Sequence, residues 1–436
     1  MRRPIIIFSL AVLFACGGMQ TGVASYNFTI LRKFDRSGHF ATGFMPSQGV
    51  DYDPVSNALY GTTEYGGNSN CHQGNGCGVV FALTPDAHGQ LTGFRRLHVF
   101  DFHTKGGKDG DGGDAVVLDP AGNLYGTSQM GGDYACSNGL GCGIVYMLEA
   151  PLFQKGMPKE RILHVFEDSD GRAPYGGLVL DPGSGALYGT TFGGGSAKSG
   201  TVFRLTPNPS KTKWNFTVLY NFSGRPDAGN PVAPLITDGH GRLFGTSEYG
   251  GRGKGFGEGT MFSLQSYGGG WKERLGLRFS LKINGEYPFP GLTPDGQGNF
   301  FAATGANCGK HLNKVCGYAL ELMPQGKTYG AQILHAFYWA DGSTLYGSAL
   351  SRDASGDLFG VAAYGGAHGN GSAYELVNAA GAYTFVKLYD FCALSGCSDG
   401  AIPFGLSSDA SGNLYGTTIA GGIGDNGEVF MLSPAR

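Results

Sequence analysis

Three observations in the amino-acid sequence predict an all-β protein, a seven-bladed β-propeller with four strands in each blade. Glycine accounts for 79 of the 436 residues, while 41% of the chain is hydrophobic and 12% is aromatic. Such a composition is typical of many short strands joined by tight turns, and it supplies enough apolar surface for a buried core. The second observation is a segment that recurs seven times, and the third is the way in which the two ends of the chain complement each other.

The recurring segment centres on a stretch of the type Gly-Asn-Leu-Tyr-Gly-Thr. Successive copies of its aromatic residue are separated by 65, 63, 56, 57, 58 and 56 residues. The seven aromatic residues are Tyr60, Tyr125, Tyr188, Phe244, Phe301, Phe359 and Tyr415. Four stretches of about five residues, repeated with a period above about forty, are typical of propeller blades, so each copy predicts one blade.

Each copy contains four short apolar stretches, which we expect to form the four strands of its blade. The first is rich in glycine, as in residues 176–181, and leads into an Asp-x-x-Gly turn such as residues 409–412. The "LYGTT" stretch follows as the second strand. The third and fourth strands resemble "TVFRL" (201–205) and "ILHVF" (162–166).

The two ends of the chain predict how the ring closes. The first apolar stretch after the N-terminal segment, "TILRKF" (29–34), matches a fourth strand, and the chain ends directly after the third strand of the last copy. The N-terminal strand can therefore complete the last blade, and closure removes the exposed sheet edge of an open array. We expect residues 26–436 to form one propeller domain.

The N-terminal segment, residues 1–25, resembles an export signal. Arg2 and Arg3 precede an apolar run over residues 4–15 that is too short to cross a bilayer. Two cleavage patterns are open: a lipobox at residues 13–16 would leave Cys16 lipidated, whereas ordinary cleavage within residues 22–25 would remove it. We expect an exported protein without a transmembrane span that is periplasmic, anchored to the outer membrane or extracellular.

The other eight cysteines fall into close pairs, which agrees with export. The pairs are Cys71/Cys77, Cys136/Cys142, Cys308/Cys316 and Cys392/Cys397. Zinc sites usually need two closely spaced pairs together, or histidines at matched spacing, and these pairs lie in different copies. We therefore favour local disulfides, each worth about 2–3 kcal/mol, formed in an oxidising compartment.

One face of the ring carries most of the distinctive loops. Antiparallel strands place the loops after the second and fourth strands at the same end of each blade, and all four cysteine pairs occur in such loops. Acidic residues beside glycine occur there too: Asp109, Asp111, Asp170, Asp227, Asp341 and Asp399. Because function concentrates on loops held by a rigid scaffold, we expect these residues to bind the ligand.

Two patterns suggest metal chemistry. The loop "DGDGGD" offers Asp109, Asp111 and Asp114 to a calcium ion, but it lacks the spacing of an EF-hand, and we favour a solvated turn. His98, His164 and His335 recur in the fourth strand, where other copies have Arg32, Tyr220 and Tyr389. That position therefore tolerates several polar residues on an outer strand, and we expect no metal, no other cofactor and no catalytic residue there.

The repeated pattern of Asp-Gly, Gly-Gly-Leu, "GNLYGTT" and Gly-Gly resembles the bacterial GloVer-type tandem repeat of "choice-of-anchor" exported proteins. The resemblance covers all seven copies and is weakest in the fifth, where "NFFAATG" (299–305) replaces the usual stretch. It implies a propeller-like exported protein and brings no catalytic residues. Relatives carry surface anchors at one end, so here the anchor would be Cys16.

Two classes of function follow. We favour a binding or scaffold module, monomeric, that recognises a glycan or protein through the disulfide-containing face. The alternative is an enzyme, such as a lyase, hydrolase or lactonase, with a metal or carboxylate site in the central funnel. Acidic inner strands would favour the enzyme, but the inner strands are small and apolar. A net charge of −3 without a basic run argues against nucleic acid as a partner.

Overall fold

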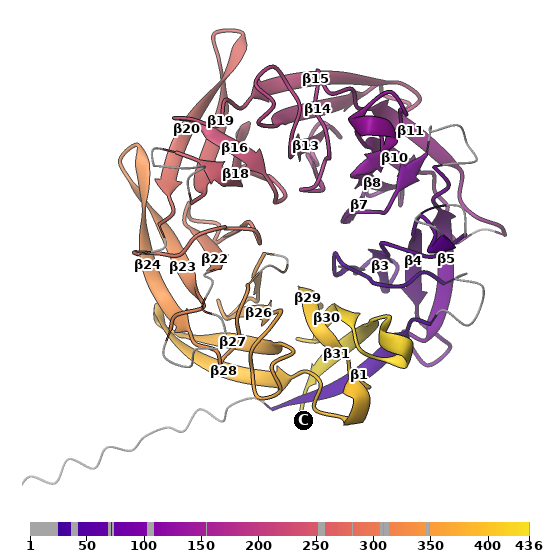
Figure 1. Cartoon of the computed structure of the whole chain (residues 1–436), viewed down its shortest axis with the longest axis vertical. Helices are drawn as coiled ribbons and strands as arrows, with labels where there is room; N and C mark the ends of the chain where they lie inside the picture. Colours follow the sequence, from indigo (N-terminus) through magenta and orange to yellow (C-terminus); the bar gives the residue numbers. More distant parts are fainter. Residues whose placement is uncertain are drawn as a thin grey trace, which may run out of the picture.

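The computed structural model describes residues 25–35, 42–68, 71, 74–102, 109–153, 155–251, 258–280, 282–305, 308, 314–345, 347 and 349–435. The predicted export segment up to residue 24, with Cys16, lies outside the described residues. Seven antiparallel sheets surround a central axis, which confirms the predicted seven-bladed propeller (Figure 1). No helix in the described part of the chain is long and apolar enough to cross a membrane.

Blades 1 to 4 follow one another along the chain, and each runs from its innermost strand outward. Blade 1 consists of β2 (Val50–Asp53), β3 (Ala58–Thr62), β4 (Val79–Thr84) and β5 (Gly93–Val99). Blade 2 consists of β7 (Val116–Leu118), β8 (Leu124–Ser128), β10 (Ile144–Leu148) and β11 (Glu160–Val165). Blade 3 consists of β12 (Leu178–Leu180), β13 (Leu187–Thr191), β14 (Thr201–Pro207) and β15 (Trp214–Asn221). Blade 4 has a divided inner strand, and consists of β16 (Ala228–Pro231), β17 (Ile236–Thr237), β18 (Arg242–Gly250), β19 (Thr260–Tyr267) and β20 (Gly270–Arg278).

Blades 5 to 7 repeat the arrangement. Blade 5 consists of β21 (Leu292–Pro294), β22 (Phe300–Gly305), β23 (Gly317–Gln325) and β24 (Thr328–Phe337). Blade 6 consists of β25 (Ser351–Arg352), β26 (Leu358–Ala362), β27 (Ser372–Ala379) and β28 (Ala382–Asp390). Blade 7 consists of β29 (Ala401–Ser408), β30 (Leu414–Ala420), β31 (Glu428–Pro434) and, outermost, β1 (Tyr26–Lys33). The described loops add a short pair, β6 (Gly110–Asp111) with β9 (Met130–Gly131), and the 3-10 turns η2 (Ser137–Gly139), η3 (Ser395–Cys397) and η4 (Ile423–Asp425).

The ring is closed by the two ends of the chain, as the sequence predicts. Strand β1 pairs antiparallel with β31, from Tyr26 opposite Pro434 to Lys33 opposite Glu428. In Figure 1 the indigo β1 lies beside the yellow β31 in the same blade. Blade 7 therefore combines one N-terminal and three C-terminal strands.

The glycine of the "LYGTT" stretch is explained by the residue opposite it on the third strand. In blade 3, Gly189 lies opposite Phe203, and a Cβ atom on Gly189 would lie 2.5 Å from the Phe203 ring carbon Cζ. The glycine leaves room for the ring to lie across the second strand. In blade 5 the pair is Ala302 opposite Leu320, whose smaller side chain accommodates the methyl group. The unusual fifth copy thus preserves the packing by changing both partners.

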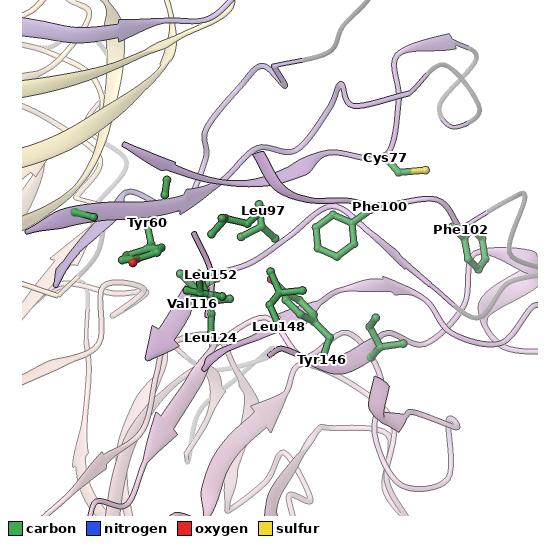
Figure 2. Packing of buried hydrophobic residues seen from close by; sticks show 14 of the residues in the cluster. Tyr60, Cys77, Leu97, Phe100, Phe102, Val116, Leu124, Tyr146, Leu148 and Leu152 are labelled. Carbon is green, nitrogen blue, oxygen red and sulfur yellow. The ribbon is translucent and has the colours of Figure 1, made fainter. Parts of the chain in front are cut away.

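Buried residues gather between neighbouring blades. Between blades 1 and 2, Tyr60 and Leu97 of blade 1 pack in one cluster with Leu124, Tyr146 and Leu148 of blade 2 (Figure 2). All five side chains are at most 1% exposed. Because each blade packs on both neighbours in this way, the ring is a continuous core that can support irregular loops at its ends.

The third and fourth strands of every blade share a β-bulge at the same place. In blade 1, Val80 lies opposite His98 and Phe81 lies opposite Arg96, so Leu97 is the extra residue. The equivalent shift occurs in the other six blades. A bulge increases strand twist and redirects the following side chain. Here it directs the recurring polar residue of the fourth strand toward the loop beyond it.

Candidate functional site

The loops after the second and fourth strands lie at one end of the ring, here called the decorated face. Three disulfides, Cys71–Cys77, Cys136–Cys142 and Cys308–Cys316, lie between second and third strands. The fourth, Cys392–Cys397, lies between blades 6 and 7. All four local pairings predicted from the sequence are therefore confirmed, and all four lie on the predicted face.

Five of the six acidic residues predicted on this face hold the loops in which they occur. In blade 3, the Asp227 carboxylate accepts hydrogen bonds from the Tyr220 hydroxyl and the Ser223 backbone N–H, both at 3.0 Å. In blade 1, the Asp109 carboxylate lies 3.4 Å from the His98 ring and accepts the Asp101 N–H at 2.9 Å. The same pairing joins Asp170 to His164, Asp341 to His335 and Asp399 to Tyr389.

This pairing gives the recurring histidines and tyrosines of the fourth strand a partner that the sequence did not reveal. The bulge aims each ring at the carboxylate that closes the next loop. A structural role for these five carboxylates is therefore established by their contacts, whereas direct contact with a ligand stays a prediction.

The sixth acidic residue, Asp111, lines a cavity at the decorated end of the central channel. The central channel itself contains a cavity of about 310 Å³ to which every blade contributes. Its lining is mostly small and apolar, as the inner strands predict, and consists of Gln48, Ala115, Tyr175, Gly176, Val232, Pro234, Phe289, Pro290, Gly347, Ala349 and Phe404. Carboxylates are absent from this lining among the described residues.

A second cavity of about 240 Å³ lies at the decorated end of the channel, and it shares three residues with the first. We call its polar and aromatic lining the channel mouth: Gln48, Glu64, Asp111, Gln129, Tyr175 and Phe404. Glu64 and Gln129 follow the second strands of blades 1 and 2, and Asp111 and Tyr175 stand in the loops before the inner strands of blades 2 and 3. Loops from separate blades thus bring two carboxylates, two amides and two aromatic rings together.

Asp114 orients two side chains of the channel mouth, Gln48 and Gln129. Its side chain is only 1% exposed, and one carboxyl oxygen accepts hydrogen bonds from the amides of Gln129 at 2.8 Å and Gln48 at 3.4 Å. Burial raises the pKa of this carboxyl well above its usual range, although the Gln129 and Thr127 hydrogen bonds oppose the shift. Burial thus favours the protonated form of Asp114, and one of its carboxyl oxygens orients the two amides.

Tyr175 is the exposed aromatic group of the channel mouth, with 39% of its surface accessible. Burial of the rest of the side chain raises the pKa of its hydroxyl, and three carboxyl groups raise it further: Asp114, Glu64 and Glu248. The hydroxyl therefore stays protonated and can donate a hydrogen bond. The ring and hydroxyl together suit a ligand with both an apolar face and polar groups.

Two of the disulfides support the loops of the channel mouth. The Cys77 carbonyl accepts a hydrogen bond from the Gly112 N–H at 2.7 Å, directly after Asp111. The Cys142 carbonyl accepts one from the Ala173 N–H at 2.9 Å, two residues before Tyr175. Each bridge closes a loop in one blade, and a carbonyl of that loop holds the loop of the next blade.

The three carboxylates considered for calcium do not converge. Asp109 faces His98, Asp114 faces Gln129, and Asp111 lines the channel mouth. Within the described ranges, ligand atoms of three suitable side chains come within 4.8 Å of one another in two groups, Cys71–Cys77–Asp111 and His98–Asp109–Glu160. The first group contains a disulfide, and the second consists of the His98–Asp109 pair of the loop closure with Glu160, whose carboxylate lies 3.2 Å from the His98 ring. The calcium hypothesis thus has no converging ligand set here.

Most of the channel mouth was missed by the sequence analysis, although one signal was present. An aromatic residue occurs at the same place near the inner strand in "APYGG", "YPFPG" and "IPFGL", which contain Tyr175, Phe289 and Phe404. These three rings line the channel. Gln48, Glu64 and Gln129 carry no comparable pattern, because they come together only when the ring closes.

A family model matches part of the chain. Residues 141–314 match the model of the Gloeobacter/Verrucomicrobia repeat. This part of the propeller is similar to that repeat. The matched region includes the fifth copy's "NFFAATG" stretch, the least regular of the seven. No curated protein matches the chain.

Solved structures share the fold at low sequence identity. A fungal alcohol oxidase in complex with copper is 11% identical, with a TM-score of 0.54 over 94% of this chain and 76% of that one. A polysaccharide lyase is 12% identical, with a TM-score of 0.51 over 93% of this chain and 94% of that one. A gluconolactonase from Xanthomonas campestris is 10% identical, with a TM-score of 0.41 over 91% and 89% of the two chains. The first two likenesses support the propeller fold of this repeat protein.

Proposed function

We propose that the protein is an exported binding propeller whose channel mouth recognises a neutral carbohydrate. The observation that carries this proposal is the combination of the exposed Tyr175 ring with Gln48, Gln129, Glu64 and Asp111 around one cavity. Sugars present apolar C–H faces that pack on aromatic rings, and hydroxyl groups that donate to carboxylates and exchange hydrogen bonds with amides. A rigid ring that presents such groups is preorganised for binding.

The charge of the channel mouth favours a neutral ligand over an anionic one. Glu64 and Asp111 line the cavity, and none of the described residues that line it or the channel below is Lys, Arg or His. An acidic sugar would therefore meet two carboxylates without a compensating cation. A neutral glycan donates hydroxyl hydrogens to the same carboxylates.

The test is a screen of neutral oligosaccharides on a glycan array, followed by titration calorimetry with the best binder. Tyr175→Ala and Gln129→Ala should each weaken binding by about tenfold, because each removes a stacking surface or a positioned hydrogen-bond partner. Tyr338→Ala alters a tyrosine that is 42% exposed and lies in the loop between blades 5 and 6, and it should leave affinity unchanged. Equal loss in all three variants, or no loss in the first two, would contradict the proposal.

The disulfides supply a second test of the same site. Replacing Cys71 and Cys77 by serine should increase the mobility of the loop that carries Asp111 and lower affinity, because the Cys77 carbonyl holds Gly112. Replacing Cys392 and Cys397, which do not line the channel mouth, provides the matched control. Similar affinity in both variants would show that the bridges do not support the site.

The enzymatic alternative keeps one supporting observation, the pair of carboxylates Glu64 and Asp111 in the cavity. Two carboxyl groups with different environments are a common arrangement for acid–base chemistry on sugars. Catalysis would be established if the protein released products from a bound oligosaccharide, and if this release disappeared in Glu64→Gln and Asp111→Asn while binding persisted. Binding without turnover would leave the protein a binding module.

Export is the second part of the proposal. It is supported by the apolar run at residues 4–15 and by the four disulfides, which form in oxidising compartments. N-terminal sequencing of the mature protein distinguishes the two cleavage patterns. A lipidated N-terminal Cys16, lost from the membrane fraction in Cys16→Ser, would indicate an anchored protein, and a start near Ser25 would indicate ordinary secretion.

A further inference from the structure

A groove of about 550 Å³ lies between blades 4 and 5, on the face opposite the decorated face. Its lining includes Asp238, Gly298 and Lys327, which stand in turns after first or third strands. The hairpins β19–β20 and β23–β24 form its walls and extend outward from the ring in Figure 1. This groove shares no residue with the channel mouth.

The corresponding positions between earlier blades are bridged by side chains. Between blades 1 and 2, Arg95 donates a hydrogen bond to the Gly156 carbonyl at 2.9 Å. Between blades 2 and 3, the Lys211 ammonium lies 2.5 Å from the Asp119 carboxylate. Between blades 4 and 5 the chain leaves open space instead. The two earlier junctions are therefore bridged at the position where blades 4 and 5 leave a groove.

The groove is positively charged, although the whole protein has a net charge of −3. Lys272 and Arg274 alternate on β20 toward blade 5, and Lys327 stands at the tip of the opposite hairpin. In the described part of the chain, none of these three cations has a carboxylate within 4.0 Å. A fourth cation, Arg242, is paired with Asp238 at 3.9 Å. Three cations are thus available to an anionic ligand.

The one other acidic residue of the lining, Glu273, does not cancel this charge. Burial and the neighbouring Asp227 raise its pKa to about 8, so the carboxyl is mostly protonated at neutral pH. Strand alternation also directs Glu273 away from its neighbours Lys272 and Arg274. Its contact with Asp227 places it toward blade 3.

Aromatic rings form the floor and one rim of the groove. Phe244 and Phe300 lie 4.7 Å apart between ring centres, and Tyr329 lies 5.7 Å from Phe300. Tyr267, at the end of β19, is 79% exposed. An exposed ring of this size beside free cations suits a flat ligand with an apolar face and anionic substituents.

We propose that this groove binds a segment of an anionic polysaccharide, one that carries carboxylate or sulfate groups on its sugar rings. The rings would pack on Tyr267 and Tyr329, and the anionic groups would pair with Lys272, Arg274 and Lys327. An acidic peptide fits less well, because the rings of Tyr267 and Tyr329 offer stacking surfaces that suit the apolar faces of sugar rings.

The test uses hexameric oligogalacturonate as the probe and a neutral hexasaccharide of glucose as its control, with the full mature protein and titration calorimetry. Oligogalacturonate should bind at least about tenfold more tightly than the neutral sugar, and its affinity should fall as salt rises from about 50 to 300 mM. The double variant Lys272→Gln with Arg274→Gln should lose about tenfold in affinity. Tyr267→Ala should weaken binding of the uronate chain without changing its salt dependence.

Lys213→Gln is the matched control, because Lys213 is an exposed lysine beside the corresponding hairpin turn of blade 3. It should bind oligogalacturonate like the parent. Absence of oligogalacturonate binding, equal binding of the neutral hexasaccharide, or an unchanged double variant would each overturn the proposal. Tighter binding of poly-glutamate or oligothymidylate at the same residues would replace the ligand class. Tyr175→Ala should leave this binding intact, so the two sites fail independently.

Discussion

Deleting residues 26–35 should destabilise the whole ring, because this strand joins three blades. Strand β1 completes blade 7, while Phe28 stacks on Tyr389 of blade 6 at 4.2 Å between ring centres. On the other side, Phe34 is completely buried and packs on Phe81 of blade 1 at 5.4 Å. Removal would expose the edge of β31 and open the core on both sides of blade 7.

The size of the effect can be worked from these contacts. Truncating one fully buried phenylalanine such as Phe34 costs about 3–5 kcal/mol, and the partly buried Phe28 adds about 1–2 kcal/mol. The two contributions sum to about 4–7 kcal/mol, and a loss of about 5 kcal/mol is a large share of the usual stability of a domain. With an unfolding entropy of about 2.1 cal/mol/K per residue over roughly 400 residues, it corresponds to a fall of about 6 °C in Tm.

The assay compares thermal and urea unfolding of residues 25–436 with those of a protein that begins at residue 36. Phe34→Ala should reproduce more than half of the loss, whereas Phe153→Ala, at a ring that is 40% exposed, should have little effect. A synthetic peptide of residues 25–35 should raise the Tm of the shortened protein by pairing with β31. A shortened protein that melts within about 2 °C of its parent, and does not respond to the peptide, would refute the closed ring as the source of stability.

Two further predictions concern the strands. Gly189→Ala should lower the free energy of unfolding in urea by about 1–3 kcal/mol, because the new methyl would lie 2.5 Å from the Phe203 ring. Adding Phe203→Leu should recover part of that loss, as in the natural Ala302–Leu320 pair. A neutral single variant would contradict this packing. Glu428 is fully buried at the junction of β31 and β1. Burial raises the pKa of its carboxyl to about 7, although Lys33 lowers it. The protonated form therefore stabilises the fold below pH about 4.5, and this contribution is lost as pH rises through about 7. Glu428→Gln should therefore gain urea resistance relative to the parent at pH 8 and show little difference at pH 5, whereas parallel pH profiles for the two proteins would argue against a protonated Glu428.

The two proposed sites use opposite faces of one scaffold in different ways. The channel mouth has carboxylates, amides and Tyr175, and needs the loops of several blades to be in place. The groove between blades 4 and 5 has cations and aromatic rings on two extended hairpins. Because the core packs each blade on its neighbours, changes in either set of surface residues should leave the ring intact.

The sequence by itself determined the architecture of this protein. The period of nearly sixty residues, the four apolar stretches in each copy and the complementary chain ends were enough to predict seven blades and their closure, because strand and turn preferences are local and were repeated seven times. The close spacing of the cysteines likewise predicted each disulfide, since a separation of five to eight residues leaves few other partners within reach. The departure in the fifth copy was visible in sequence, but its compensation by Leu320 required the register of the strands.

Only the tertiary structure decided what the acidic and aromatic residues do. Five of the predicted aspartates contact His or Tyr of the fourth strand, because a β-bulge directs those rings toward the loop. No residue pattern in the sequence predicts this bulge. Asp111 reached the channel mouth beside Gln129 and Tyr175 because residues far apart in sequence become neighbours only when the blades meet around the axis. The groove between blades 4 and 5 depends on the same fact, because its two walls come from different copies. The width of the space between them is set by how the two blades are oriented relative to each other, and the sequence of either copy alone does not determine it.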